Sequence, residues 1–280
     1  MLNQRIVTAI GMAIFFIGSL IYLDPYSFSI LVALVVAYGS WEWANLSGFC
    51  SFWSKLLYTF FVLGILVFLG SILGLGKTEP LDLHVAKSLL TWLVSWWAVA
   101  LLWIQGYPSS AVLWGSRLGR ATIGLLVLAP TWMAASILIS LNKGEWLIFA
   151  VILIVAFADI GAYFVGSKFG KHKLARNVSP NKTWEGFFGA VLANLFLILF
   201  LGVFLELSAT GWLTLFVAVI ATVLASVVGD LLQSMVKRHR GVKDSGNILP
   251  GHGGILDRID SLTAALPVFA LIFIYNNFQF

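Results

Sequence analysis

Charged side chains are scarce in this sequence, and cysteine is almost absent. Of 280 residues, 10% are Asp, Glu, Lys or Arg and 60% are hydrophobic, whereas charged residues make up about a quarter of an ordinary soluble domain. A chain with so few charged residues could not form a surface that is stable in water. It is therefore predicted to be an integral membrane protein. The one cysteine, Cys50, cannot form an internal disulfide, and no oxidising compartment is indicated.

Several common catalytic signatures are also missing. The sequence contains no GxxxxGK[ST] phosphate loop, no HExxH zinc motif, no GxSxG nucleophile motif and no DG…AR…G…D…D pattern of CDP-alcohol phosphotransferases. Chemistry built on those motifs is therefore not expected. Any site must be assembled from the few polar residues that interrupt the apolar runs.

Apolar runs of about 20 residues, the length that crosses a bilayer, occur nine times. They cover residues 5–23, 27–46, 55–75, 87–105, 121–141, 145–167, 184–206, 211–234 and 259–279. The first run resembles a signal peptide, but no small-x-small cleavage site precedes Asp24, so we interpret it as a retained span. The predicted fold is an all-α polytopic membrane protein with about nine transmembrane helices.

The basic residues predict the orientation of these spans, because Lys and Arg collect in cytoplasmic loops. With the N-terminus inside, three of the 17 Lys and Arg residues, Lys77, Lys87 and Lys143, fall in outer loops, and all others fall in inner segments. A cytoplasmic N-terminus is therefore expected. We divide the chain into N-terminal transmembrane helices without chemical motifs, residues 1–120, and a C-terminal catalytic region facing the cytoplasm, residues 121–280.

Polar residues gather where the sixth to ninth runs meet the cytoplasmic side. Asp159 interrupts the sixth run, either as a metal or substrate contact or as a structural hydrogen-bonding residue, since a carboxylate inside a span is costly and normally faces protein or water. Asp230, Ser234 and Lys237 recur at i, i+4 and i+7 and share one helix face. Lipid alone would not accommodate that face.

Two inner loops are rich in phosphate-binding residue types. Residues 168–183 end in a cap region with Lys182 and Thr183, which forms an anion site in principle; the alternative is a basic loop that only orients the helix. Residues 234–260 carry Lys237, Arg238 and Lys243, followed by GHGG, whose glycines let backbone amides approach an anion.

Acidic residues follow directly. Asp257 and Asp260 supply hard oxygen ligands of the kind that suit Mg²⁺, which usually takes one or two carboxylates together with substrate phosphates. His252 could hydrogen-bond phosphate, and it has no second histidine at metal-ligand spacing. The residues thus indicate a membrane enzyme that handles a phosphorylated substrate with Mg²⁺ at the cytoplasmic face.

The stretch from Ser234 to Asp260 resembles the signature of phosphatidate cytidylyltransferases, also called CDP-diacylglycerol synthases. The matching pattern reads S-x-x-K-R-x(4)-K-D-x-G-x-x-L-P-G-H-G-G-x-x-D-R-x-D. An upstream block from Ala158 to Gly186 also resembles this family, with Ile160 at a position where Thr or Ser is expected. The two blocks cover roughly residues 156–262, and the N-terminal spans carry no motif.

The resemblance implies that CTP and phosphatidate react to give CDP-diacylglycerol and pyrophosphate, with Mg²⁺ or another divalent cation. It implies metal ligation by Asp230 and Asp257, with Asp159 and Asp260 as possible additions, and catalytic roles for the same two aspartates and for Lys237, Arg238, Lys243 and Asp244. The expected phosphate contacts are Lys171, Ser179, Lys182, Thr183, Ser234, His252, Gly253, Gly254 and Arg258.

The expected setting is a multi-pass protein of a bacterial inner (plasma) membrane, surrounded by membrane lipids, acting as a homodimer and without a nucleic acid partner. Two alternatives stay open. A transporter would use Asp159 and Asp230 as ion sites, and a CTP-using polyprenol kinase would release CDP instead of pyrophosphate. Glu42, in the second run, has no assigned role beyond a structural hydrogen bond.

Overall fold

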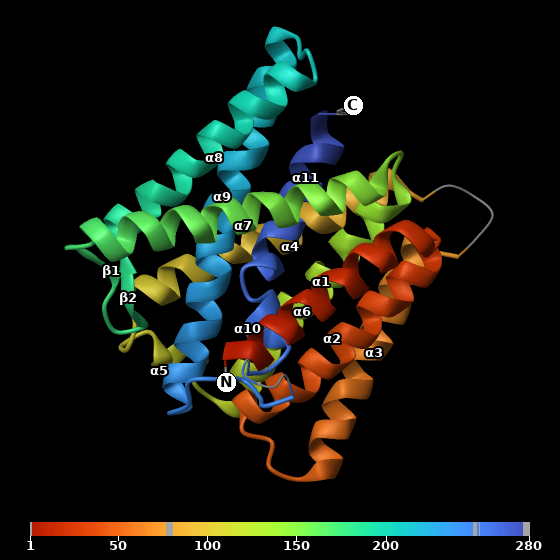
Figure 1. The fold of residues 1–280 in the computed structure, drawn as a ribbon. Helices are drawn as coiled ribbons and strands as arrows, with labels where there is room; N and C mark the ends of the chain where they lie inside the picture. The colour runs from red at the N-terminus through yellow and green to blue at the C-terminus, as the bar shows by residue number, and fades with distance from the viewer. Residues whose placement is uncertain (1, 77–80, 249–250, 252, 277–280) are drawn as a thin grey trace.

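A computed structural model describes residues 2–76, 81–248, 251 and 253–276. It is a bundle of long helices joined by short connections (Figure 1). The long helices are α1 (Leu2–Tyr22), α2 (Pro25–Ser47), α3 (Phe52–Leu73), α4 (Leu83–Gln105), α6 (Arg117–Ser140), α7 (Gly144–Phe169), α8 (Trp184–Phe204), α9 (Ala209–His239) and α11 (Leu262–Asn276). Two short helices, α5 (Ala111–Trp114) and α10 (Leu256–Ile259), lie in the connections.

The all-α polytopic fold is confirmed. In the part of the chain that the structure describes, seven helices are long and apolar enough to cross a membrane, and shorter apolar helices cover Ile10–Tyr22 and Leu262–Asn276. Each of the nine predicted spans corresponds to one of these helices, with ends that agree to within five residues. The cytoplasmic placement of the N-terminus stays a prediction.

One small β-hairpin was not predicted. Strands β1 (Lys173–Ala175) and β2 (Ser179–Thr183) pair antiparallel, with Lys173 opposite Thr183 and Ala175 opposite Ser179. The sequence SPNKT has no alternating apolar pattern, so its strand character comes from this pairing and from the Trp184 N–H, which donates to the His172 carbonyl at 2.9 Å. The hairpin replaces the irregular loop expected over residues 168–183.

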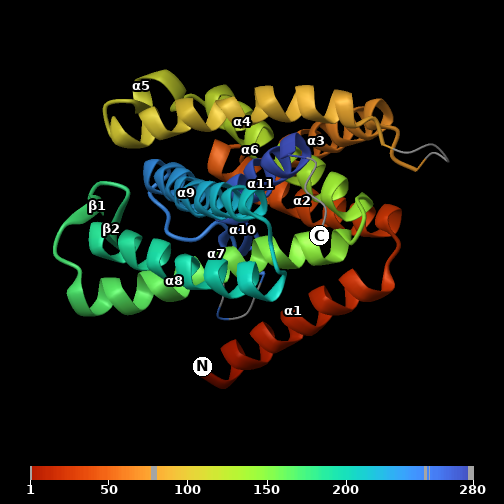
Figure 2. The same cartoon turned by 90° about the horizontal axis from the view of Figure 1, so that it is seen from above.

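The helices pack around α6, whose side chains are buried almost without interruption from Val127 to Ile139. Figure 2 shows α1 at one edge and α4 at the opposite edge, with α9, α10 and α11 between them. Helices α7 and α8 approach closely because Gly161 and Gly189 face each other, and a Cβ on Gly161 would overlap the Gly189 carbonyl. The polar loops therefore converge beside α9.

Candidate functional site

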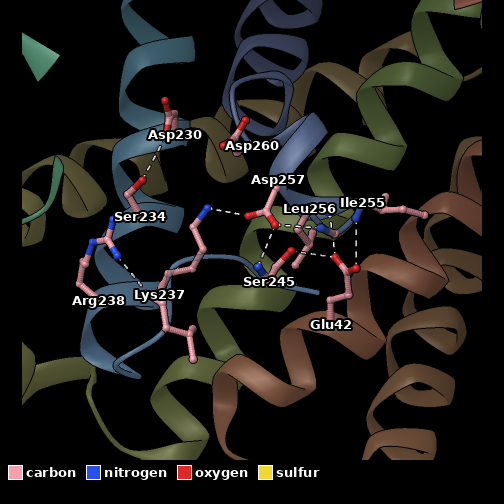
Figure 3. A network of polar contacts seen from close by, with 12 residues as sticks. Glu42, Asp230, Ser234, Lys237, Arg238, Ser245, Ile255, Leu256, Asp257 and Asp260 are labelled. Atoms are coloured by element: carbon pink, nitrogen blue, oxygen red, sulfur yellow. Dashed lines mark hydrogen bonds and ion pairs between the residues drawn. The ribbon is translucent and has the colours of Figure 1, made fainter. Parts of the chain in front are cut away.

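The polar face of α9 forms one wall of the site. The Ser234 hydroxyl donates to Asp230 Oδ1 at 3.2 Å, and Lys237 Nζ lies 2.7 Å from Asp257 Oδ1. Figure 3 shows these side chains along one side of the helix, with Lys237 reaching toward α10. The predicted common face of Asp230, Ser234 and Lys237 is thus present.

Asp257 lies at the centre of a compact network. Its Oδ1 accepts from Lys237 Nζ, and its Oδ2 accepts from the backbone N–H groups of Ser245 and Gly254 at 2.8 and 2.9 Å. Burial acts to raise the pKa of this carboxyl, but the hydrogen bonds from Lys237 and the two amides outweigh it and hold the pKa below its ordinary value. Asp257 is therefore ionised and organises the loop that precedes it.

Asp260 lies beside Asp230 at the junction of α10 and α11. Helix α9 approaches this junction closely, since a Cβ on Gly229 would lie 2.7 Å from the Asp260 carbonyl oxygen. Burial, reinforced by the neighbouring Asp230 carboxylate, raises the pKa of Asp260 well above its ordinary value. Two carboxyl groups that repel each other in this way form a site that favours a cation.

The glycines of the loop have the conformations expected from the sequence. Gly251 and Gly253 have φ angles of 74° and 80°, in the left-handed region that other residues rarely adopt. The Gly254 N–H donates to Asp257, so this amide holds the loop together in the present structure. His252, one of the predicted phosphate contacts, lies outside the described residues. The same is true of Leu249 and Pro250.

A cavity of about 520 Å³ lies between α7, α8, α9 and strand β2. Its polar lining includes Asp159, Tyr163, Ser179, Lys182 and Thr183, while Leu174, Phe187, Ala190 and Val227 make its apolar lining. Lys182 Nζ forms an ion pair with Asp230 Oδ2, which links the hairpin to α9. One hollow thus offers both charged and apolar walls.

The start of α8 borders this cavity. Thr183 is the N-cap of α8, and its Oγ1 accepts from the Gly186 N–H at 3.1 Å, as the cap region predicted. Lys171 lies elsewhere: it lines a second, open cavity of about 810 Å³ with His172, Lys173 and Arg176. The structure therefore separates Lys171 from the other predicted phosphate contacts of this segment.

Four further predicted residues are exposed near the loop and do not line the 520 Å³ cavity: Arg238, Lys243, Asp244 and Arg258. Arg238 has the clearest contacts, because its Nε lies 3.4 Å from the Val178 carbonyl and its Nη1 lies 3.3 Å from the Val242 carbonyl. It connects the end of α9 with the hairpin turn, and its side chain stays exposed to solvent.

Glu42 is the residue whose role the sequence did not reveal. It comes from α2, is 1% exposed and accepts hydrogen bonds from the Ser245 hydroxyl and from the N–H groups of Ile255 and Leu256. The expected structural hydrogen bond is confirmed, and its partners lie in residues 245–256, which we call the signature loop (Figure 3). The only signal in the sequence was a lone carboxylate in an apolar run.

The carboxylates of the site can be compared with the ligands that a divalent cation requires. Within the described residues, no three Asp, Glu, His or Cys side chains are arranged to hold a metal ion. Asp230 and Asp260 form a neighbouring pair of hard oxygen donors, which fits Mg²⁺ when substrate phosphates complete the shell. Among the described residues, Asp257 Oδ1 accepts a hydrogen bond only from Lys237, so this oxygen keeps a lone pair for a cation next to the ammonium.

Comparison with known proteins identifies the family of this chain. Residues 3–275 match the cytidylyltransferase family, so the chain belongs to that family of enzymes. It is 41% identical over 272 residues to a phosphatidate cytidylyltransferase of Pseudomonas aeruginosa, covering 97% of each chain.

Two other relatives carry the same name. The enzyme of Haemophilus influenzae is 37% identical over 300 residues, covering 98% of this chain and 99% of its own. The enzyme of Staphylococcus epidermidis is 48% identical over 133 residues, covering 48% of this chain and 51% of its own.

Proposed function

We propose that the protein is a phosphatidate cytidylyltransferase, which joins CTP and phosphatidate to form CDP-diacylglycerol and pyrophosphate. The observation that carries this proposal is the cavity between α7, α8 and α9, which is lined both by Lys182, the partner of Asp230, and by apolar side chains. Such a cavity suits a substrate with an anionic headgroup and hydrocarbon chains. Full-length similarity to two phosphatidate cytidylyltransferases supports the same reaction.

The reaction joins two anions. A phosphatidate phosphate oxygen attacks the α-phosphorus of CTP, a new P–O–P bond forms, and the bond to the β-phosphate breaks so that pyrophosphate leaves. Repulsion between the reactants is the main obstacle, so positively charged groups of the site are expected to provide much of the catalysis. A phosphate monoester is already ionised near neutral pH, and a strong general base is not needed.

Residues at different positions are proposed to bind different parts of the two substrates. Lys182, Ser179 and Thr183 line the cavity and are proposed to bind substrate phosphate there, together with Ser234 on α9. Arg238, Lys243 and Arg258 are exposed beside the signature loop and are proposed to draw in and hold the triphosphate. Lys237, held by Asp257, is proposed to provide a further positive charge on α9.

Asp230 and Asp257 are proposed to hold the divalent cation, with Asp260 beside Asp230 (Figure 3) and Asp159 in the adjoining cavity as additional oxygen donors. Bound there, the cation would neutralise charge on the phosphates and on the leaving pyrophosphate. Lys182, which pairs with Asp230, would compete with such a cation for this carboxylate and would offer its ammonium to a phosphate oxygen in the same cavity.

Pyrophosphate release tests the reaction directly. Purified protein in mixed micelles receives CTP, phosphatidate and Mg²⁺, and parallel samples omit one component, replace CTP with ATP or add EDTA. We expect release only when CTP, phosphatidate and Mg²⁺ are all present. Release of CDP with a phosphorylated lipid would support the kinase alternative, and solute flux in liposomes without nucleotide turnover would support a transporter.

We further propose that the site faces the cytoplasm of a bacterial inner membrane and that the enzyme acts as a homodimer. Cys50, the one cysteine, is exposed between α2 and α3 and reports the orientation. A membrane-impermeant maleimide should label Cys50 in inside-out vesicles and leave it unlabelled in intact spheroplasts. The reverse pattern would overturn the proposed orientation, and a monomeric mass of the active enzyme in detergent would overturn the dimer.

A further inference from the structure

Glu42 is bonded to both ends of the signature loop, although it lies more than 200 residues away in sequence. Its Oε2 accepts from the Ser245 hydroxyl and from the Leu256 N–H, both at 2.9 Å, and its Oε1 accepts from the Ile255 N–H at 3.1 Å. Ser245 begins the loop and Ile255 and Leu256 end it. One carboxylate therefore fixes the separation of the two ends.

The loop also fits around this carboxylate. A Cβ on Gly246 or on Gly254 would overlap Glu42 Oε1, so both glycines allow the backbone to close on the acid. From the other side, Asp257 accepts from the N–H groups of Ser245 and Gly254. The loop ends lie between two carboxylates, and a shift at Glu42 must move the partners of Asp257 as well.

Helix α2 provides a rigid base for Glu42. The next residue, Trp43, is fully buried, and its Nε1 donates to the Arg120 carbonyl of α6 at 2.8 Å. Gly124 on α6 leaves the space that the indole occupies. These contacts of Trp43 join α2 to α6 and involve no residue of the signature loop.

We propose that Glu42 is a positioning residue of the cytidylyl transfer site. It touches no substrate; it sets the loop that holds Asp257, and through Asp257 it sets the Lys237 ammonium. The inference rests on the proposed function, and it assigns to the N-terminal helices a part in the reaction that their lack of motifs did not suggest. The expected consequence of disturbing Glu42 is a fall in kcat without an equal fall in substrate affinity.

The substitution Glu42→Gln preserves shape and isolates this role. Each carboxylate oxygen accepts from at least one donor, so the amide NH₂ faces a donor whichever way it is turned. We expect kcat to fall on the order of 10- to 100-fold, because misplacement of catalytic groups by about 1 Å has effects of that size. The KM for CTP should change by less than about threefold.

Trp43→Phe is the matched control, since it removes a buried hydrogen bond of the same helix and leaves the loop contacts intact. If Glu42 only stabilised the fold, the two variants would lose activity in proportion to their loss of thermal stability. We expect Trp43→Phe to retain kcat within about threefold at a comparable fall in Tm. Ser245→Ala should reduce kcat less than Glu42→Gln does. Combining the two substitutions should lower kcat little further than Glu42→Gln alone, because the two side chains share one hydrogen bond.

Hydrogen exchange measured by mass spectrometry provides a readout that needs no turnover. In Glu42→Gln, the peptide from Lys243 to Leu256 should exchange faster than in the unchanged protein, and in Trp43→Phe it should not. Unchanged exchange in Glu42→Gln, or a kcat loss equal to that of Trp43→Phe, would overturn the proposal. If the unchanged protein transfers no cytidylyl group, the proposed function fails, and the exchange result alone decides whether Glu42 holds the loop.

Discussion

Lys237 of α9 and Asp257 of α10 face each other with Nζ 2.7 Å from Oδ1, and both side chains are less than a tenth exposed. A buried ion pair gains little over an apolar pair, but losing one partner leaves a charge without compensation. This pair also joins the last spanning helices to the signature loop, because Asp257 holds Ser245 and Gly254 on its other oxygen.

Removing one partner of this pair should therefore destabilise the protein. We expect Lys237→Met to lower the free energy of unfolding by about 3–5 kcal/mol, the usual range for one orphaned member of a buried pair. Thermal unfolding in detergent measures the effect as a lower midpoint. Glu145→Gln, an exposed acid at the start of α7, is the control and should leave the midpoint unchanged. Equal midpoints for Lys237→Met and the unchanged protein would contradict the pair's role.

Asp230→Asn should separate catalysis from folding. Asp230 is only partly buried, and its contacts are with Lys182 and Ser234, so the fold should survive the change. We expect turnover to fall by about 100-fold or more, since a proposed ligand is lost for the cation that would neutralise the transferring phosphates. Pyrophosphate release at saturating CTP measures it, with the elution profile from size exclusion as the test of folding. Near-normal turnover would remove Asp230 from the proposed cation site.

The exposed cations beside the loop should act on nucleotide binding. We expect Arg238→Ala and Lys243→Ala each to raise the KM for CTP about three- to tenfold and to weaken its dependence on salt, because exposed charges attract an anion through screened interactions. Lys87→Ala removes the same charge at α4, where Lys87 lies over the Tyr275 ring, and should change neither quantity. A KM that is equally sensitive to all three substitutions would indicate a general charge effect.

The close approach of α7 and α8 predicts a stability contrast between two glycines. A Cβ on Gly189 would lie 2.6 Å from the Gly161 carbonyl oxygen and against Val165, whereas one on Gly64 of α3 would meet no atom within 4 Å. Gly189→Ala should lower stability by about 1–3 kcal/mol through overpacking. Gly64→Ala should be neutral or stabilising, because Ala suits a helix better than Gly. The thermal midpoints of the two variants decide the question.

Much of this architecture was predictable because lipid imposes a simple rule on the sequence. Apolar runs of spanning length gave the nine helices, and the i, i+4, i+7 spacing gave the α9 face with Asp230, Ser234 and Lys237. The β-hairpin was missed because three- and five-residue strands have too few positions for a pattern and depend on their pairing. Thr183 was identified as part of a cap region because its neighbours, a proline before and an apolar run after, are local in sequence.

The details of the site depended on contacts that no local pattern reveals. Glu42 meets its donors across more than 200 residues. Lys171 and Lys182 line different cavities, although the hairpin pairs Lys173 with Thr183. The engagement of Asp257 by two backbone amides depends on glycine conformations that a motif can suggest but cannot place.

The position of Glu42 also has a consequence for how the chain is assembled as it is synthesised. Helix α2 is synthesised before the signature loop, and the donors to the Glu42 carboxylate come from residues 245–256, more than 200 residues later. Until then an acid that finishes 1% exposed has none of its three partners, and a partner-less carboxylate is unstable in an apolar environment. The arrival of the signature loop therefore gives this acid its hydrogen-bond donors and at the same time places the loop beside Asp257.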